Sequence, residues 1–250
     1  MRVRRHSIIE LAQHGINSDH PSAACRYDGD VEPERTRDAR FLLMPTEKNW
    51  LRTWQDLGLP QADLVLWRTL LGRYAEPHRQ YHTRAHLKAC LKHFDAVRHL
   101  ATHPAEIELA LWFHDAVYDI PGAGNEARSA DWARDVLQAA GASTEVAARV
   151  HALIMASCHN TQPQTPDQEL LLDVDLAILG APATLFDAYE TQIRAEYASV
   201  PEQAFRKGRR HILETFLARQ PIFRTHYFST RYEAQARANL RRSVDRLQHR

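Results

Sequence analysis

The adjacent residues His114 and Asp115 are the feature that most restricts how this chain can fold. They end an apolar segment, 107–113, that reads Ile-Glu-Leu-Ala-Leu-Trp-Phe. Because Ile107, Leu111 and His114 stand at positions i, i+4 and i+7, the spacing predicts a helix that carries them on one face. An imidazole and a carboxylate are therefore expected on a surface that faces the core. Ionisable groups there cost several kcal/mol unless they are paired or bound to a metal.

Two further residues are candidate partners for this pair. His86 lies in the stretch Tyr-His-Thr-Arg-Ala-His-Leu, and Asp175 lies in Leu-Leu-Asp-Val-Asp-Leu. Each is on or beside a segment that is itself predicted to be helical. The ordered set of two imidazoles and two carboxylates suits a divalent metal ion, although mixed nitrogen and oxygen ligation does not select one metal strongly.

This ordered set resembles the HD superfamily of metal-dependent phosphohydrolases, which is named for its His-Asp doublet. The resemblance covers roughly residue 50 to the C-terminus and is strongest to a bacterial branch with YHTRAH, FHDAVYD, NEARSA and LLDVDLAILG as they stand here. It implies an all-α fold, in which a single HD-type helical bundle domain carries additional C-terminal helices. It also implies that His86, His114, Asp115 and Asp175 hold one divalent metal ion, which could be Mn, Co, Mg, Ni, Fe or Zn.

The composition excludes several other classes of protein. The chain has 250 residues, of which 44% are hydrophobic and 25% charged, as in ordinary globular proteins. Its formal charge of +1 gives no bias toward nucleic acid or membranes. The three cysteines form neither a disulfide framework nor a CxxC zinc motif, which suits a reducing compartment. No apolar run approaches the ~20 residues of a membrane span. We therefore expect a cytoplasmic protein that binds a small-molecule phosphate substrate and no nucleic acid or membrane; the sequence leaves the oligomeric state open.

Helical spacing of apolar residues begins at Thr46 and continues to the C-terminus, and strand signals are nearly absent. The periodicity therefore predicts an all-α domain over residues 44–250. Residues 1–43 contain few periodic apolar residues and are expected to form a poorly ordered N-terminal extension. The predicted helices cover about residues 46–57, 64–74, 83–97, 104–115, 125–140, 144–159, 167–180, 182–199, 201–219 and 232–248.

Two residues are candidates for acid–base catalysis beside the expected metal site. Asp119 lies four residues after Asp115, and alarmone hydrolases of the same superfamily carry acids at about this point, where they help to activate water. The alternative for Asp119 is a carboxylate in a turn at the end of the helix. His82 lies four residues before His86 and is expected next to it, on the same helix or around its start.

Arginines near the expected site are candidates for binding the substrate phosphate. Arg79 and Arg84 flank His82, and a guanidinium can form two parallel hydrogen bonds with a phosphate. The alternative is a solvated basic turn. Two basic runs, 206–210 and 237–246, lie on predicted helices, and the sequence does not show which way they face.

Glu126 and His159 are candidates for the second shell of the metal or for a second metal. Glu126 follows a glycine-containing loop and could be a general acid, a ligand, or an acid that interacts favourably with a helix dipole. His159 and His151 are predicted on the helix 144–159, and some superfamily members supply a ligand to a second metal near its end. The dinuclear branches usually offer more histidines than this chain, which favours one ion.

The resemblance implies a phosphohydrolase that attacks a nucleotide or another small phosphate ester with metal-bound hydroxide. In this interpretation His82 or Asp119 assists the attack. Two alternatives remain: a di-iron oxygenase of the same superfamily, and a non-catalytic metal- or nucleotide-binding sensor. Metal content separates the oxygenase from the hydrolase, and turnover of phosphate esters separates the sensor.

Overall fold

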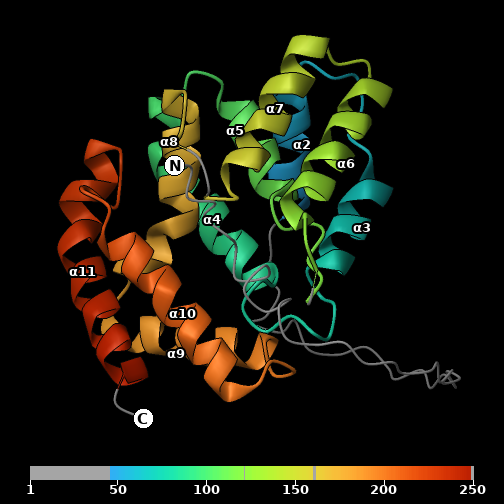
Figure 1. Ribbon diagram of the computed structural model, residues 1–250. Coiled ribbons are helices and arrows are strands. Elements are labelled where there is room, and N and C mark those ends of the chain that lie inside the picture. Colours follow the sequence, from blue (N-terminus) through green and yellow to red (C-terminus); the bar gives the residue numbers. More distant parts are fainter. Residues whose placement is uncertain (1–45, 121, 160–161, 249–250) are drawn as a thin grey trace, which may run out of the picture.

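The computed structural model describes residues 46–120, 122–159 and 162–248, and within these ranges the chain is helical without a strand (Figure 1). This confirms the all-α fold, whereas the expected extension 1–43 lies outside the described residues. No described helix is long and apolar enough to cross a membrane. The elements are α2 (Glu47–Asp56), α3 (Leu64–Arg73), α4 (Arg84–Val97), η3 (Arg98–Leu100), α5 (Pro104–Phe113), α6 (Asn125–Ala139), α7 (Thr144–Ala156), α8 (Pro166–Asp175), η4 (Leu176–Gly180), α9 (Ala183–Glu196), α10 (Glu202–Leu217) and α11 (His226–Gln248).

Helix ends follow local capping rules where the capping residue is close in sequence. The side chains of Thr46 and Thr83 accept hydrogen bonds from the backbone N–H groups of Asn49 and Ala85, which confirms both predicted starts. Pro104 occupies the first turn of α5, where its missing N–H costs nothing. Local sequence was thus enough to locate these three starts.

Helix α5 lies in the centre of the protein. Every residue from Ala105 to Phe113 is buried, and α5 contacts α2, α4, α6, α7 and α8. The expectation of one core-facing stripe was therefore too narrow, because neighbours surround the whole helix. The helix also ends at Phe113, so His114 and Asp115 lie in the turn that follows it. A rigid, fully packed helix thus fixes the position of the pair.

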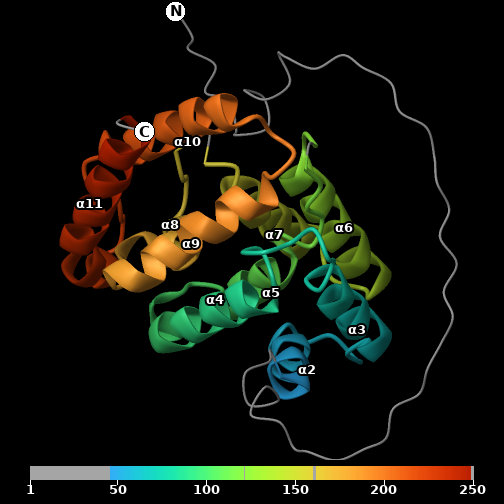
Figure 2. The same ribbon diagram turned by 90° about the horizontal axis from the view of Figure 1, so that it is seen from below.

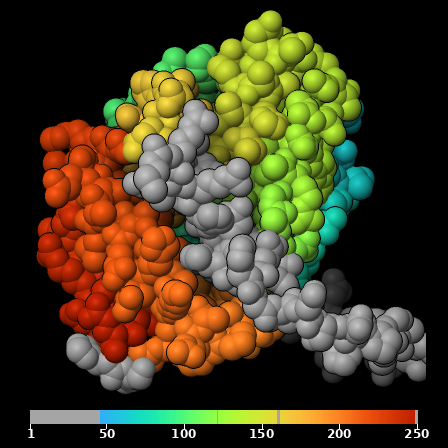
Figure 3. Space-filling view, in the orientation of Figure 1, coloured from blue at the N-terminus to red at the C-terminus, as the bar shows by residue number. Residues whose placement is uncertain are grey.

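Helix α5 contacts both α4 and α8, and α4 contacts α8. Figures 1 and 2 show α9, α10 and α11 at one end of the molecule and α2, α3 and α6 at the other. On the face shown in Figure 3, the orange and red surfaces of α10 and α11 lie opposite the green and yellow surfaces of α6 and α7. Buried apolar residues from Trp50 to Val244 form one core cluster, so the described helices share one interior.

The junction of α8, η4 and α11 depends on two contacts between distant residues. A Cβ atom added at Gly180 would lie 2.6 Å from Cβ of Tyr232 and 2.7 Å from its carbonyl oxygen, so α11 packs directly on this glycine. The carboxylate of Asp173 accepts the backbone N–H groups of Arg224 at 2.9 Å and Thr225 at 2.7 Å. Helix α11 therefore begins at His226, earlier than the predicted residue 232, because a carboxylate from α8 caps it.

Candidate metal centre

Four side-chain donor atoms converge where α4, α5 and α8 meet. Nε2 of His86 lies 3.1 Å from Nε2 of His114. Oδ2 of Asp115 lies 3.4 Å and 3.0 Å from these two nitrogens, and Oδ1 of Asp175 lies 3.3 Å and 3.6 Å from them. Two donors that are each about 2.1 Å from one ion are about 3.0 Å apart in octahedral and about 3.4 Å apart in tetrahedral coordination. These five distances are compatible with one metal ion at this point.

The secondary structure explains how these donors meet. His86 lies in the first turn of α4, Asp115 in the turn after α5, and Asp175 at the last residue of α8. Nδ1 of His114 donates a hydrogen bond to the carbonyl of Leu111 at 2.8 Å, which leaves the lone pair on Nε2, toward the other donors. The imidazole is thus already oriented for metal binding.

Cys90 belongs to the same buried cluster and was not predicted. Its Sγ and the donor atoms of His86, His114 and Asp175 all lie within 4.8 Å of one another, and this group could hold a metal ion. However, Sγ lies 3.8 Å from Nδ1 and 3.6 Å from Nε2 of His86, so the sulfur is beside the ring rather than in line with the Nε2 lone pair. Oδ2 of Asp115 lies nearer to Nε2 of His86, at 3.4 Å, so Asp115 and Cys90 are both candidates for the fourth ligand. The spacing of Cys90 four residues after His86 could have indicated this contact.

The electrostatics of the cluster favour positive charge. Burial acts to lower the pKa of the His86 and His114 imidazoles, but the polar and negative groups around them outweigh it and raise each pKa well above its ordinary value. Burial likewise acts to raise the pKa of Asp115 and Asp175, but the adjacent histidines hold each pKa well below its ordinary value. The cluster therefore stabilises cations, either as protons on the imidazoles or as a metal ion.

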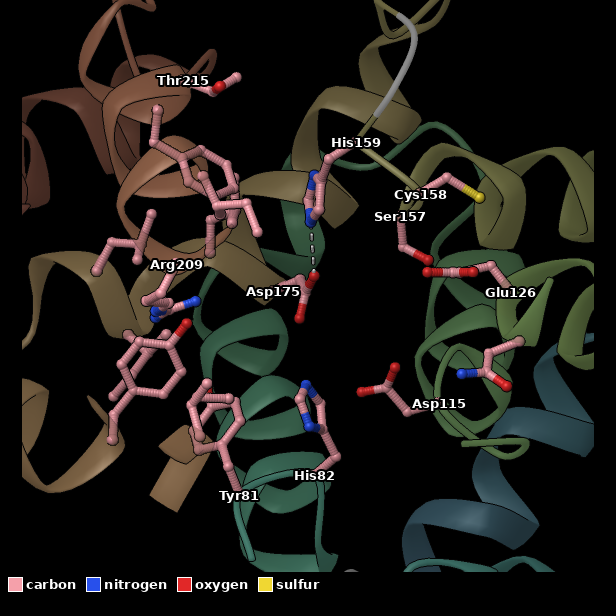
Figure 4. A pocket seen from close by; sticks show the side chains of 18 of the residues that line it. Tyr81, His82, Asp115, Glu126, Ser157, Cys158, His159, Asp175, Arg209 and Thr215 are labelled. Carbon is pink, nitrogen blue, oxygen red and sulfur yellow. Dashed lines mark hydrogen bonds and ion pairs between the residues drawn. The ribbon is translucent and has the colours of Figure 1, made fainter. Parts of the chain in front are cut away.

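The cluster opens into a cavity of about 240 Å³. Figure 4 shows the side chains of His82, Asp115 and Asp175 around the same space, with Arg209 on one side and Glu126 on the other. The structure thus brings the predicted residues His82 and Glu126 to the cavity, together with Arg209 from the first basic run.

His82 is held by Glu196, a residue that the sequence did not indicate. Nδ1 of His82 lies 2.7 Å from Oε2 of Glu196, which also accepts the hydroxyl of Tyr118 at 3.0 Å. Oε1 accepts the backbone N–H groups of Gln80, Tyr81 and His82 at 2.9, 2.8 and 2.8 Å. Burial acts to raise the pKa of Glu196, but hydrogen bonds from His82 and the backbone outweigh it and lower the pKa to about 2. Because an ionised carboxylate can only accept, Nδ1 of His82 is the donor in this hydrogen bond.

The structure does not bring Asp119 to the cavity. Its side chain is exposed and pairs with Nη1 of Arg128 at 2.7 Å. The prediction placed Asp119 one helical turn after Asp115, but the chain leaves the helix after Phe113, so a spacing of four residues no longer means the same face. The position of Asp119 agrees with the alternative considered for it, a carboxylate in a turn after the helix.

Neither candidate phosphate-binding arginine faces the cavity. Arg79 is buried, and its Nη1 donates to the carbonyls of Asp115 at 2.6 Å and His82 at 3.2 Å. Its Nε also donates to Glu76 at 3.1 Å. Nε of Arg84 donates to the carbonyl of Leu71 at 2.7 Å. Arg79 therefore ties the backbone of Asp115 to the backbone of His82 and does not line the cavity.

His159 contacts the outer oxygen of Asp175. The predicted helix 144–159 ends at Ala156, and His159 follows it in a left-handed conformation with φ 54°. Its Nε2 lies 3.3 Å from Oδ2 of Asp175, so it orients that carboxylate from the side away from the other donors. His151, in contrast, pairs with Asp131 at 3.2 Å and does not line the cavity.

The two basic runs serve mainly structural contacts. Of their described residues, Arg209 lines the cavity, where it is buried and pairs with Glu190. Arg206 donates to the carbonyl of Leu247, and both Arg242 and Arg246 pair with Asp187.

Comparisons of the chain with protein-family models, curated proteins and solved structures give no match. The resemblance to the HD superfamily therefore stays a prediction.

Proposed function

We propose that this protein is a metal-dependent phosphohydrolase that cleaves a small phosphate ester, such as a nucleotide or a related phosphorylated metabolite. The observation that carries the proposal is the convergence of donor atoms from His86, His114, Asp115 and Asp175 at the edge of a cavity that also contains His82. One divalent ion held there would acidify a bound water and offset the negative charge of the phosphate.

His82 is the group best placed to move a proton. In the hydrolysis, the oxygen of water bonds to phosphorus, the bond from phosphorus to the ester oxygen breaks, and phosphate and an alcohol are released. Nε2 of His82 takes the proton that the water loses and returns it to the departing ester oxygen. The charged carboxylate of Glu196, 2.7 Å from Nδ1, stabilises the imidazolium between these two transfers.

Arg79 fixes the position of His82, the proposed proton carrier, relative to the proposed metal ligand Asp115. Its Nη1 donates to the carbonyls of both His82 and Asp115, so the two segments cannot separate without breaking a buried charged hydrogen bond. A fixed distance between His82 and Asp115 matters because misplacement of a reacting group by 1 Å can slow a reaction about 100-fold.

Metal analysis of the purified full chain, followed by a screen of phosphate esters, tests the proposal. We expect a first-row divalent metal or magnesium at about one ion per chain, and phosphate release that chelator abolishes and added manganese, cobalt, magnesium or nickel restores. Tight metal binding without turnover of any ester would favour the sensor instead.

A di-iron oxygenase is the second candidate, and the contact between His159 and Asp175 favours it. One oxygen of Asp175 faces His86 and the other faces His159, so Asp175 and His159 would be available to hold a second ion. Two irons per chain together with consumption of dioxygen would support this candidate, whereas one ion per chain and turnover without dioxygen would reject it.

A further inference from the structure

The two sides of the cavity differ in chemistry. On one side lie Ile178 and Leu179 of η4, Ile193 of α9, and Ile212 and Phe216 of α10. On the opposite side lie polar groups of Glu126 and Ser157 (Figure 4). The cluster of donor atoms lies between the two sides. A ligand whose phosphate lies at the cluster can therefore place its remaining atoms against an apolar wall.

The two arginines from α10 and the segment after it that line the cavity already have partners, and His211 of α10 lines the cavity as well. Nε of Arg209 lies 3.2 Å from Glu190, and its guanidinium lies 5.0 Å from the centre of the Tyr189 ring. Nη2 of Arg219 donates to the carbonyl of His159 at 3.3 Å, and its guanidinium lies 4.5 Å from the centre of the Phe216 ring. No lysine is among the described residues that line the cavity. A chain of several phosphates would thus meet no lysine there and two arginines that already have partners.

The size of the cavity restricts the ligand further. Pockets that enclose drug-sized molecules usually measure about 300–1,000 Å³. At about 240 Å³ this cavity is smaller, and it suits a compact organic group. Glu126 on the polar side also opposes additional negative charge beyond the one phosphate that the cluster can balance.

We infer that the substrate is a phosphate monoester with a compact, mainly apolar organic group that packs against the wall formed by Ile193, Ile212 and Phe216. This inference rests on the proposed function for its reaction but not for its binding mode. Water cleaves the ester into inorganic phosphate and the corresponding apolar alcohol, and polyphosphates are poor substrates.

Binding of two phosphonates to the metal-loaded full chain tests this inference without turnover. Benzylphosphonate and methylphosphonate carry the same charged group and differ in the apolar ring. We expect calorimetry to show benzylphosphonate bound at least about tenfold more tightly, since apolar contacts in a pocket commonly contribute factors of this size. Ile212→Asn should remove most of that preference while methylphosphonate binding stays within about twofold, which shows that the variant is folded.

Leu185→Asn is the matched control, because Leu185 is 58% exposed on α9 and does not line the cavity. This control should keep the preference for benzylphosphonate. Equal affinity for the two phosphonates, or no binding of either, would overturn the inference. A preference for benzylphosphonate together with no hydrolysis of any phosphate ester would instead overturn the proposed function and leave the binding mode intact. Hydrolysis of ATP faster than of benzyl phosphate would count against the inference alone.

Discussion

Nδ1 of His82 lies 2.7 Å from Oε2 of Glu196, and the other oxygen of this carboxylate accepts three successive backbone N–H groups from residues 80–82. One side chain at the end of α9 thereby fixes both the ring of His82 and the backbone that leads into α4. Because α4 carries His86 in its first turn, Glu196 connects the proposed proton carrier His82 to the start of a helix that carries a candidate metal ligand.

Glu196→Gln should slow hydrolysis without removing the metal. The amide keeps the shape of the side chain and an acceptor for the backbone, but it loses the charge that stabilises a protonated His82. Steady-state kinetics should show kcat lowered about 10–100-fold with KM little changed, the usual effect of removing a partner that orients a functional group. Glu202→Gln, which alters an exposed pair with Arg194, is the control. Loss of metal in the Glu196 variant would show that the carboxylate maintains the cluster instead.

The same substitution should change how stability depends on pH. The pKa of Glu196 is lowered to about 2 in the folded chain, below its value of about 4.3 in an unfolded one. A depressed carboxyl pKa stabilises the fold above the unfolded pKa, and this stabilisation is lost as pH falls toward the folded pKa. Urea unfolding at several pH values should show the difference in free energy between wild type and Glu196→Gln shrinking by about 3 kcal/mol from neutral pH to about pH 2. A difference that is constant with pH would contradict the prediction.

Replacement of either member of the doublet should remove metal and activity together. His114→Ala and Asp115→Ala each delete one of the four converging donors and leave the others buried without a partner, so some loss of stability is also expected. Elemental analysis should show metal content falling from about one ion per chain to near zero. His151→Ala serves as the control because His151 pairs with Asp131 away from the cavity. Full metal content in either doublet variant would refute the proposed centre.

His159→Ala should keep most of the metal. His159 contacts Oδ2 of Asp175, whereas Oδ1 of the same carboxylate faces His86. Asp175→Asn, in contrast, should lose most of the ion. If elemental analysis shows that His159→Ala lowers the metal content from two ions per chain to one, the di-iron candidate gains support.

In turnover with labelled water, the label should appear in phosphate and not in the alcohol, because the water oxygen bonds to phosphorus.

Loss of the buried ion pairs of Glu108 should lower the free energy of unfolding without affecting the proposed hydrolysis. Only 1% of the Glu108 side chain is exposed, and it pairs with Arg52 at 2.6 Å and with Arg98. Glu108→Ala leaves two guanidinium groups without this partner, and we expect a loss of about 3 kcal/mol in thermal or urea unfolding. Glu214→Ala, which removes an exposed pair with Arg210, should cost less than about 1 kcal/mol.

Local sequence patterns predicted those features that depend on neighbouring residues. The starts of α2 and α4 follow from Thr46 and Thr83, whose side chains bond backbone groups within three residues. The start of α11 was wrong because Asp173 caps it from α8, and no local pattern records that contact. The extent of a helix is thus predictable only where its cap is near in sequence.

The candidate site shows the same limit. The spacing of His86, His114, Asp115 and Asp175 predicted residues that the structure does bring together. The pairing of His82 with Glu196 could not be predicted, because it depends on how α9 packs beside the start of α4. The contacts of Arg79 with two backbone carbonyls could not be predicted for a related reason, because such carbonyls have no signature in the sequence.

Helix α8 ends with two carboxylates that have different tasks. Residues two apart on a helix point in nearly opposite directions, and Asp173 accordingly caps α11 while Asp175 faces His86 and His114. Insertion of one residue just before Asp173 would rotate both carboxylates by about 100°, so that the C-terminal helix and the ligand cluster would lose their partners together. The length of α8 is therefore expected to tolerate insertion and deletion less than any surface loop of this protein.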